Sequence, residues 1–198
     1  RKAGITDYEA FAKDILTVIG DRPISYEVFA DDFAEMERQA RLIAKWGKNV
    51  FVKLPITNTK RESAIPLVKK LSAEGIQLNV TALMTLEQVQ GVTDALKGGA
   101  PANISVFAGR MADTGRDPIP MMKQSLEIMK AAPQATLIWA SPRELLNVIQ
   151  ANDIGCHIIT VTNDILAKLK LLDKDLSDYS LETVQMFYND GKASGFKL

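Results

Sequence analysis

Apolar and polar positions alternate along this chain in two regular patterns that follow one another. Short runs of apolar and β-branched residues, bounded by turn-forming residues, predict buried strands. Apolar residues spaced three or four apart predict amphipathic helices. The predicted strands cover residues 24–30, 49–57, 77–83, 103–109, 136–141 and 157–162. The predicted helices cover residues 7–19, 33–46, 60–74, 85–96, 118–130, 142–151 and 164–172.

Two of these helices carry informative start signals. Thr6 is expected to cap the first helix, with Glu9 at the spacing of a capping box. Pro66 implies that the helix over residues 60–74 either kinks or starts late, near Ile65.

Six strands, each followed by a helix, predict an α/β fold with parallel pairing and right-handed crossovers. Two architectures fit this pattern: an open doubly wound sheet and a (β/α)8 TIM barrel. Polar residues at alternate strand positions favour the barrel, because in a barrel such residues point toward the axis and line the active site near the carboxyl ends of the strands. The first strand is not followed by a glycine-rich phosphate-binding sequence, which weakens the case for a doubly wound dinucleotide-binding sheet. The polar set is Ser25, Glu27, Lys53, Asn79, Thr81, Ser105, Ser141, Thr160 and Thr162.

Composition narrows the class of protein. The chain has 198 residues, 46% of them hydrophobic and 24% charged, which is ordinary for a soluble globular domain. Its 24 basic and 24 acidic residues cancel, so charge does not indicate a nucleic-acid or membrane partner. A single cysteine excludes an intramolecular disulfide framework, and a single histidine argues against a serine–histidine triad or a histidine-rich metal site. With no membrane span or signal peptide visible, a cytoplasmic protein is expected.

Lys53 is the residue in this sequence that most clearly suggests a catalytic role. It lies in the middle of the apolar strand over residues 49–57. Burial there would disfavour the ammonium and lower the lysine pKa, and a neutral amine attacks carbonyl carbon to form a Schiff base. The alternative is a lysine whose amine reaches solvent at the end of the strand.

Five sequence motifs, in a fixed order along the chain, support the interpretation of Lys53 as a Schiff-base amine. VKLPIT, SYEVFAD, LNVTALMTLEQV, ISVFAGRMAD and WASPRE together resemble the transaldolase family, including its small-subunit, fructose-6-phosphate-aldolase-like branch. The resemblance implies a catalytic amine on Lys53, with Glu27 and Thr81 assisting proton transfer through a water. It also implies a set of substrate-binding residues, namely Asn79, Ser105, Phe107, Arg110 and Arg143.

The resemblance implies transfer of a three-carbon dihydroxyacetone unit between sugar phosphates, without a metal or an organic cofactor. The aldolase branch tends to have tyrosine and glutamine where this chain has Phe107 and Glu27, which favours transfer over simple aldol cleavage. Fructose-6-phosphate aldolase is the nearest alternative. A non-catalytic barrel fragment that binds sugar phosphate or assembles is an alternative of another class.

Structural roles remain open for the same residues. Glu27 and Lys53 can form a structural ion pair. Asn79 and Thr81 can satisfy hydrogen bonds inside the barrel, and Arg110 and Arg143 can be surface arginines.

The chain also departs from the family pattern. Its first helix resembles the second helix of the family, so residues 1–172 are expected to supply strands 3 to 8 of a barrel. Edges are then expected to be open at 24–30 and 157–162, with association or weak activity as a consequence. Val106 replaces the proline usual in the serine motif.

Residues 173–198 are expected to form a helical tail. Its apolar stripe consists of Leu181, Val184, Phe187 and Tyr188. A short helix of this kind is unstable unless it docks. The resemblance implies docking on a neighbouring subunit of a homo-oligomer; the alternative is docking on the chain's own barrel.

Overall fold

The computed structural model describes residues 4–197. The chain divides into two compact units, one ending at Val161 and the other beginning at Thr162. The sequence pattern puts the start of the tail at residue 173, one short helix later. Within residues 4–197, no helix combines the length and apolarity needed to cross a bilayer.

The first unit contains a parallel sheet whose six strands lie side by side in chain order. The strands are β1 (Ile24–Glu27), β2 (Val50–Pro55), β3 (Leu78–Leu83), β4 (Ala102–Val106), β5 (Ala135–Trp139) and β6 (Ile158–Ile159). In a doubly wound sheet the strand order reverses at a switch point, whereas in a barrel it runs in one direction. The predicted α/β class and six parallel strands are therefore confirmed, as a half-barrel. In the described residues, β1 pairs only with β2 and β6 only with β5, so the sheet does not close into eight strands.

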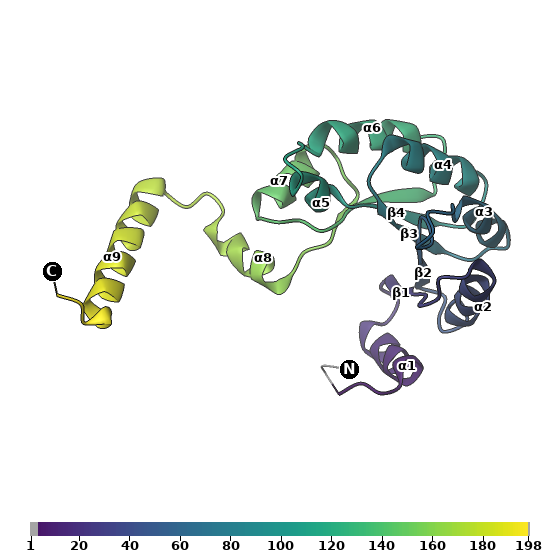
Figure 1. Ribbon diagram of the computed structural model, residues 1–198, viewed down its shortest axis with the longest axis horizontal. Helices are drawn as coiled ribbons and strands as arrows, with labels where there is room; N and C mark the ends of the chain where they lie inside the picture. The colour runs from purple at the N-terminus through teal and green to yellow at the C-terminus, as the bar shows by residue number, and fades with distance from the viewer. Residues whose placement is uncertain (1–3, 198) are drawn as a thin grey trace. The chain divides into compact units, whose positions relative to one another are not determined.

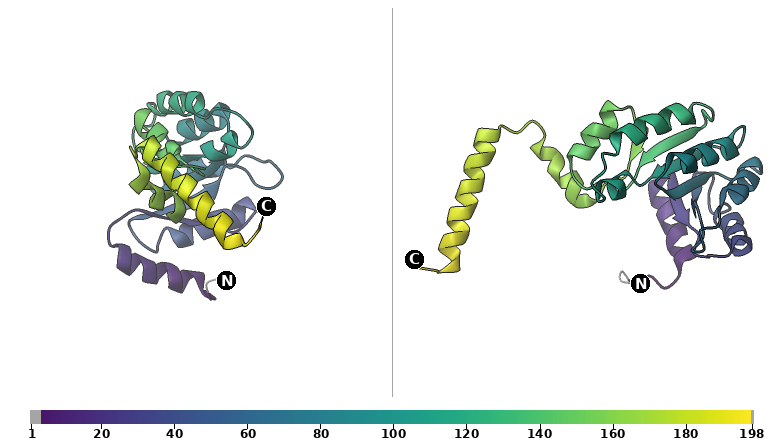
Figure 2. Two further views of the ribbon diagram at one scale, coloured as in Figure 1. Left: turned by 90° about the vertical axis from the view of Figure 1, so that its left-hand side faces the viewer. Right: turned by 45° about the horizontal axis from the view of Figure 1, so that its top comes forward.

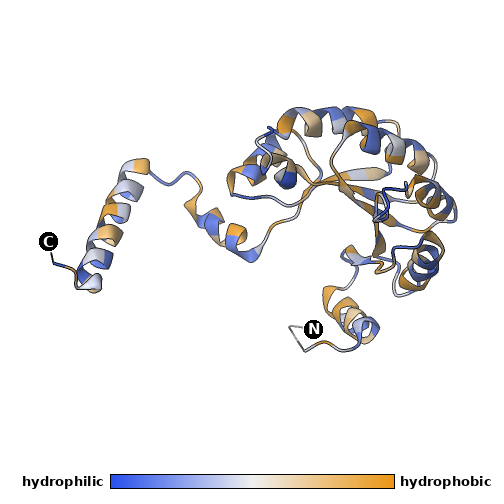
Figure 3. Cartoon of the chain, in the orientation of Figure 1, coloured by the Kyte–Doolittle hydropathy of each residue, from blue (hydrophilic) through white to orange (hydrophobic). Residues whose placement is uncertain are grey.

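Helices cover one face of this sheet. In the first unit they are α1 (Tyr8–Ile19), α2 (Phe33–Ile43), α3 (Ile65–Ala73), α4 (Leu86–Leu96), α5 (Ala108–Ala112), α6 (Ile119–Met129) and α7 (Leu146–Asp153). Figure 1 and the right-hand view of Figure 2 show α2, α3, α4 and α6 in an arc along the convex side of the sheet. Figure 3 shows mainly apolar strands inside the arc of helices, whose residues alternate between apolar and polar.

The alternation along β2 shows how the two faces of the sheet differ. Val50, Val52 and Leu54 are buried, and the residues between them are only half-buried. Because side chains alternate across a strand, the buried set packs in the helix-covered core and Lys53 lies on the opposite, inner face.

Two helix starts test the sequence signals. The cap of α1 is Asp7, whose carboxylate accepts the Ala10 N–H at 3.0 Å, so the expected Thr6 cap is wrong by one residue. The late start of the helix containing Pro66 is confirmed, because α3 begins at Ile65 with proline in its first turn.

Strand β1 is shorter than predicted because a side chain captures the backbone beyond it. The N–H groups of Phe29 and Ala30 both donate to Oε1 of Gln39, at 2.7 and 3.2 Å. At the other edge, the ring of His157 accepts the Leu137 N–H at 3.0 Å, in place of a backbone carbonyl. Side chains thus replace ladder bonds at both edges.

Helix α7 also starts later than predicted, at Leu146. Oδ1 of Asn147 accepts the N–H groups of Arg143 and Glu144, at 2.7 and 3.2 Å, and this holds the preceding residues in a loop. The short helix α5 begins inside the stretch 103–109 that the pattern predicts as a strand, and β4 ends before it at Val106.

The second unit is helical. It contains α8 (Asn163–Ala167), a 3₁₀ turn (Lys168–Leu171) and α9 (Leu176–Ser194). Helix α9 has 19 residues and continues through Gly191, so it is longer than the expected short helix. All four residues of its predicted apolar stripe are exposed: Leu181, Val184, Phe187 and Tyr188 are 56, 59, 64 and 68% exposed.

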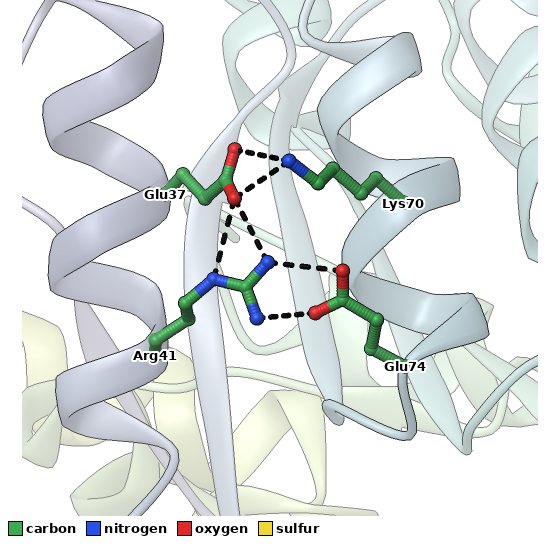
Figure 4. A network of polar contacts seen from close by, with 4 residues as sticks. All are labelled: Glu37, Arg41, Lys70 and Glu74. Carbon is green, nitrogen blue, oxygen red and sulfur yellow. Dashed lines mark hydrogen bonds and ion pairs between the residues drawn. The ribbon is translucent and has the colours of Figure 1, made fainter.

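A charged network joins α2 to α3 on the outer surface (Figure 4). Glu37 accepts from Arg41 at 2.8 Å and pairs with Lys70 at 2.7 Å, and Arg41 also binds Glu74 with both of its terminal nitrogens. The Lys70 and Arg41 hydrogen bonds lower the pKa of Glu37, and the Arg41 hydrogen bond lowers that of Glu74. The network thus ties two neighbouring βα units together.

We expect Glu74→Gln to lower the melting temperature at neutral pH and to have no effect in acid. Both carboxyl pKa values are lower in the folded chain than the ordinary 4.5, so the stabilisation is complete above that value and is lost as the pH falls through the lowered values. Thermal melts of both proteins between about pH 3 and pH 7 measure this. Glu127→Gln, which removes a carboxylate from a pair within α6, is the control. A difference that persists unchanged into acid would contradict the assignment.

Candidate active site

A pocket of about 440 Å³ lies on the inner face of the half-barrel. It gathers most of the polar residues that the alternating pattern points inward. Those among its lining residues are Ser25, Lys53, Asn79, Thr81, Ser105, Ser141 and Thr160. A second hollow of about 630 Å³, near Gly47, Gln77 and Pro101, lies where strands begin and contains none of the predicted site residues.

Lys53 pairs with Glu27 on the inner face. The two residues are direct neighbours in the register of β1 and β2, and Nζ lies 3.5 Å from Oε2. The lysine side chain is 33% exposed and the glutamate side chain 48% exposed. The amine therefore lies in a partly solvated site, between the two alternatives that the strand pattern leaves open, a dry pocket and an amine in solvent. An ion pair this exposed adds little to stability, so a structural role alone explains it poorly.

Asn79 is the centre of a buried hydrogen-bonded row. It is the register neighbour of Lys53 on β3. The Ser105 hydroxyl donates to its Oδ1 at 2.7 Å, and its Nδ2 donates to the Ser25 hydroxyl at 2.9 Å. The amide is thus held in one orientation, and its second N–H remains as a donor.

Thr81 lies at an irregularity in β3. The register with β4 shifts between Val80 and Leu83, and Ala82 between them has φ of 67°. The Thr81 side chain is 97% buried, yet its hydroxyl makes no hydrogen bond among the described residues. Bulges of this kind re-aim side chains, and Thr81 lines the pocket, so its hydroxyl is available to a water or a substrate group.

Of the predicted substrate-binding residues, Phe107 lies in the pocket, whereas Arg110 and Arg143 lie on the surface. Phe107 lines the pocket. Arg110 is exposed and stacks on the Phe107 ring, with its guanidinium carbon 5.1 Å from the ring centroid. Arg143 binds Asp113 on the surface. Neither arginine is among the lining residues of the pocket, so the structure brings both to its margin and not into it.

The connections after β4 and β5 carry these arginines, Arg110 in α5 and Arg143 in a loop, and they are packed against each other. The Gly109 N–H donates to the Ala140 carbonyl at 3.2 Å. A Cβ on Gly109 would lie 1.4 Å from the carbonyl oxygen of Ser141, which has φ of 59°. Only glycine fits at this contact, which fixes the spacing of the loops after β4 and β5.

Sequence reasoning missed two polar residues of this region. Asn103 lines the pocket and accepts a hydrogen bond from Thr136 on β5. Its position two residues before Ser105 on the same strand is the signal that would have found it. Asp113 is not among the predicted site residues, and no local pattern marks it as the partner of Arg143.

Cys156 and His157 lie outside the pocket lining. Burial raises the pKa of the Cys156 thiol. Within residues 4–197, no three histidine, cysteine or acidic side chains gather where they could hold a metal ion.

Comparisons with known proteins agree with this geometry. Residues 8–197 match the family model described as transaldolase/fructose-6-phosphate aldolase. A "Probable transaldolase" of Dehalococcoides mccartyi is 35% identical over 89% of this chain and 78% of its own length. A "Probable transaldolase" of a Thermoanaerobacter species is 33% identical over 97% and 83%, respectively.

A solved mandelate oxidase variant shares the fold. Its TM-score is 0.52 and its identity 18%, over 75% of this chain and 50% of that one. The chain therefore spans about half the length of that solved protein.

We expect Gly109→Ala to destabilise the first unit by roughly 1–3 kcal/mol, because the added methyl group overpacks against backbone that cannot rotate away. Denaturant unfolding measures the loss. Gly191→Ala is the control: it lies inside α9 with nothing within 4 Å of the new Cβ, so we expect no loss there. Equal stability of Gly109→Ala and the unaltered chain would show that the two loops are not tightly packed.

Proposed function

The chain belongs to the transaldolase/fructose-6-phosphate aldolase family, and we propose that it transfers a three-carbon dihydroxyacetone unit between sugar phosphates through a Schiff base on Lys53. One observation carries the proposal. Lys53, Glu27 and the partnerless hydroxyl of Thr81 come together on the inner face of one half-barrel, beside a fixed amide. An amine, an acid/base and a hydroxyl that can hold a water are the groups that Schiff-base chemistry needs.

In the first step, the Lys53 amine adds to the keto carbon of the donor sugar. Loss of the carbonyl oxygen as water then leaves an iminium ion. Glu27 supplies and removes the protons through a water held by Thr81. The remaining N–H of Asn79 donates to the developing hydroxyl of the carbinolamine. The solvated position of the Glu27–Lys53 pair leaves room for that water.

In the second step, the bond between C3 and C4 of the donor breaks. Its electron pair moves toward the iminium nitrogen and forms an enamine, and the C4 hydroxyl gives up its proton to Glu27 as C4 becomes an aldehyde. The protein needs no metal or organic cofactor for this step, because the iminium ion is the electron sink. The released aldose leaves, and the three-carbon unit stays on Lys53.

In the last step, the enamine carbon attacks the aldehyde of an acceptor sugar. The aldehyde oxygen takes a proton back from Glu27, and water hydrolyses the new iminium ion to release the product and the free amine. Phosphate groups of donor and acceptor are bound by Arg110 and Arg143 at the margin of the pocket, because planar guanidinium groups match phosphate oxygens.

Phe107 favours transfer over release. It lines the pocket together with Lys53. A phenol at this position could protonate the enamine and release free dihydroxyacetone, whereas a phenyl ring cannot. The enamine therefore waits for an acceptor aldehyde.

We further propose that the chain forms a homo-oligomer through α9. The exposed apolar residues of this helix, such as Leu181 and Phe187, are the kind of surface that docks on another protein. Light scattering of the chain and of a Leu181→Ser/Phe187→Ser variant tests this. The variant should have the smaller mass, and equal masses would overturn it.

Borohydride reduction with fructose 6-phosphate should trap a three-carbon adduct on Lys53. Lys53→Arg should abolish the adduct, since a guanidinium stays protonated and cannot act as the amine. Intact mass followed by peptide mapping measures both results. Lys60→Arg, a change at an exposed lysine on the loop after β2, is the matched control and should trap normally. An adduct on any other lysine, or none in a folded sample, would refute the assignment.

Consumption of fructose 6-phosphate should require an acceptor such as erythrose 4-phosphate. Phe107→Tyr should allow slow consumption without acceptor, because it adds a proton donor. Coupled assays with and without acceptor measure this for both proteins. Equal rates with and without acceptor in the unaltered chain would favour the fructose-6-phosphate aldolase activity instead.

A further inference from the structure

Asp113 makes a specific contact that the family resemblance does not assign. It caps the carboxyl end of α5, and its carboxylate binds Arg143, 30 residues later on the loop after β5. Nε of Arg143 donates to Oδ1 at 2.9 Å, and Nη2 donates to Oδ2. The pair therefore joins two different loops in a bidentate geometry.

The backbone around this pair is already fixed. Gly109 packs on the Ser141 carbonyl, and Asn147 holds the Arg143 backbone N–H at 2.7 Å. Ser141 itself lines the pocket. Arg143 thus starts from a rigid position two residues from the pocket wall, and only its long side chain needs to be oriented.

The carboxylate uses only one side of the guanidinium group. Arginine has five N–H donors. Asp113 takes the one on Nε and one on Nη2, and among the described residues the two on Nη1 make no hydrogen bond. The end formed by Nη1 and Nη2 is left as a second fork, with the spacing that suits phosphate oxygens.

Stability does not explain the contact. The side chains of Arg143 and Asp113 are 47 and 51% exposed. Exposed pairs contribute little to folding, because the side-chain entropy lost offsets the weak attraction in water. What the pair does achieve is to restrict an arginine that would otherwise sample many rotamers.

We propose that Asp113 is a positioning residue, which orients Arg143 so that its outer fork receives the phosphate group of a sugar-phosphate substrate. This inference rests on the proposed function. A side chain held in its binding rotamer before the ligand arrives loses less entropy when the ligand binds. The negative charge of Asp113 opposes the phosphate weakly, because both lie in solvent.

Asp113→Asn tests the proposal, because it keeps the size of the side chain and removes the second acceptor oxygen. Glu144→Gln is the matched control: it removes the same charge next to Arg143 without touching the pair. We expect Asp113→Asn to raise the dissociation constant for inorganic phosphate and the KM for fructose 6-phosphate by about 3- to 10-fold. We expect an unchanged kcat, no change in KM for unphosphorylated fructose, and no effect of Glu144→Gln.

Calorimetry gives the phosphate affinity even where turnover is slow. Unchanged phosphate affinity in Asp113→Asn would overturn the inference, and so would tighter binding, which would make Asp113 a competitor of phosphate. Absence of phosphate binding in the unaltered chain, or unchanged binding in Arg143→Gln, would overturn it as well. Reductive trapping of unphosphorylated dihydroxyacetone on Lys53 tests the proposed function separately, since it does not involve Arg143.

Discussion

The site depends on the register of the parallel strands. Glu27, Lys53, Asn79, Asn103 and Thr136 are successive register neighbours on five adjacent strands. Because strand order follows chain order without reversal, all five crossovers wind the same way and leave the same face of the sheet without helices. Five polar residues therefore form one row across the inner face. A slip of one residue in any strand would send its polar side chain into the helix-covered core and break the row.

Much of the polar inner face was predictable because it rests on local alternation, although Asn103 and Thr136 of the row were not among the predicted polar residues. Lys53, Asn79, Thr81 and Ser105 each lie between apolar neighbours, and period two is enough to place them together on one face. The row's internal bonding was not predictable. Which of its residues satisfy one another depends on the curvature of the sheet, and this curvature lets Asn79 on β3 reach Ser25 on β1 across β2. The bulge at Thr81 was also hidden, since LNVTAL alternates like a regular strand.

The ends of elements were harder to predict, because side chains distant in sequence compete for the backbone. Gln39 captures two N–H groups beyond β1, and Asn147 captures two ahead of α7. Neither has a distinctive local signal. The geometry of the arginines at the rim of the pocket could not be predicted for a related reason. Arg110 and Arg143 were found as motif residues, but their geometry is set by Gly109 against Ser141 and by Asp113, contacts that span about 30 residues of sequence.

The inner row and the rim differ in how they are held, and the difference matches the work that each is proposed to do. On the inner face, the amide of Asn79 and the hydroxyls of Ser25 and Ser105 satisfy one another, so Asn79 keeps one donor at a fixed place beside Lys53. Bond cleavage needs this precision, because small displacements of a reacting group cost rate. At the rim, the backbone is rigid but the charged groups stay in water, where a phosphate can replace solvent without first displacing protein. Lys53 combines the two situations, because its neighbours are fixed while its own amine remains partly solvated.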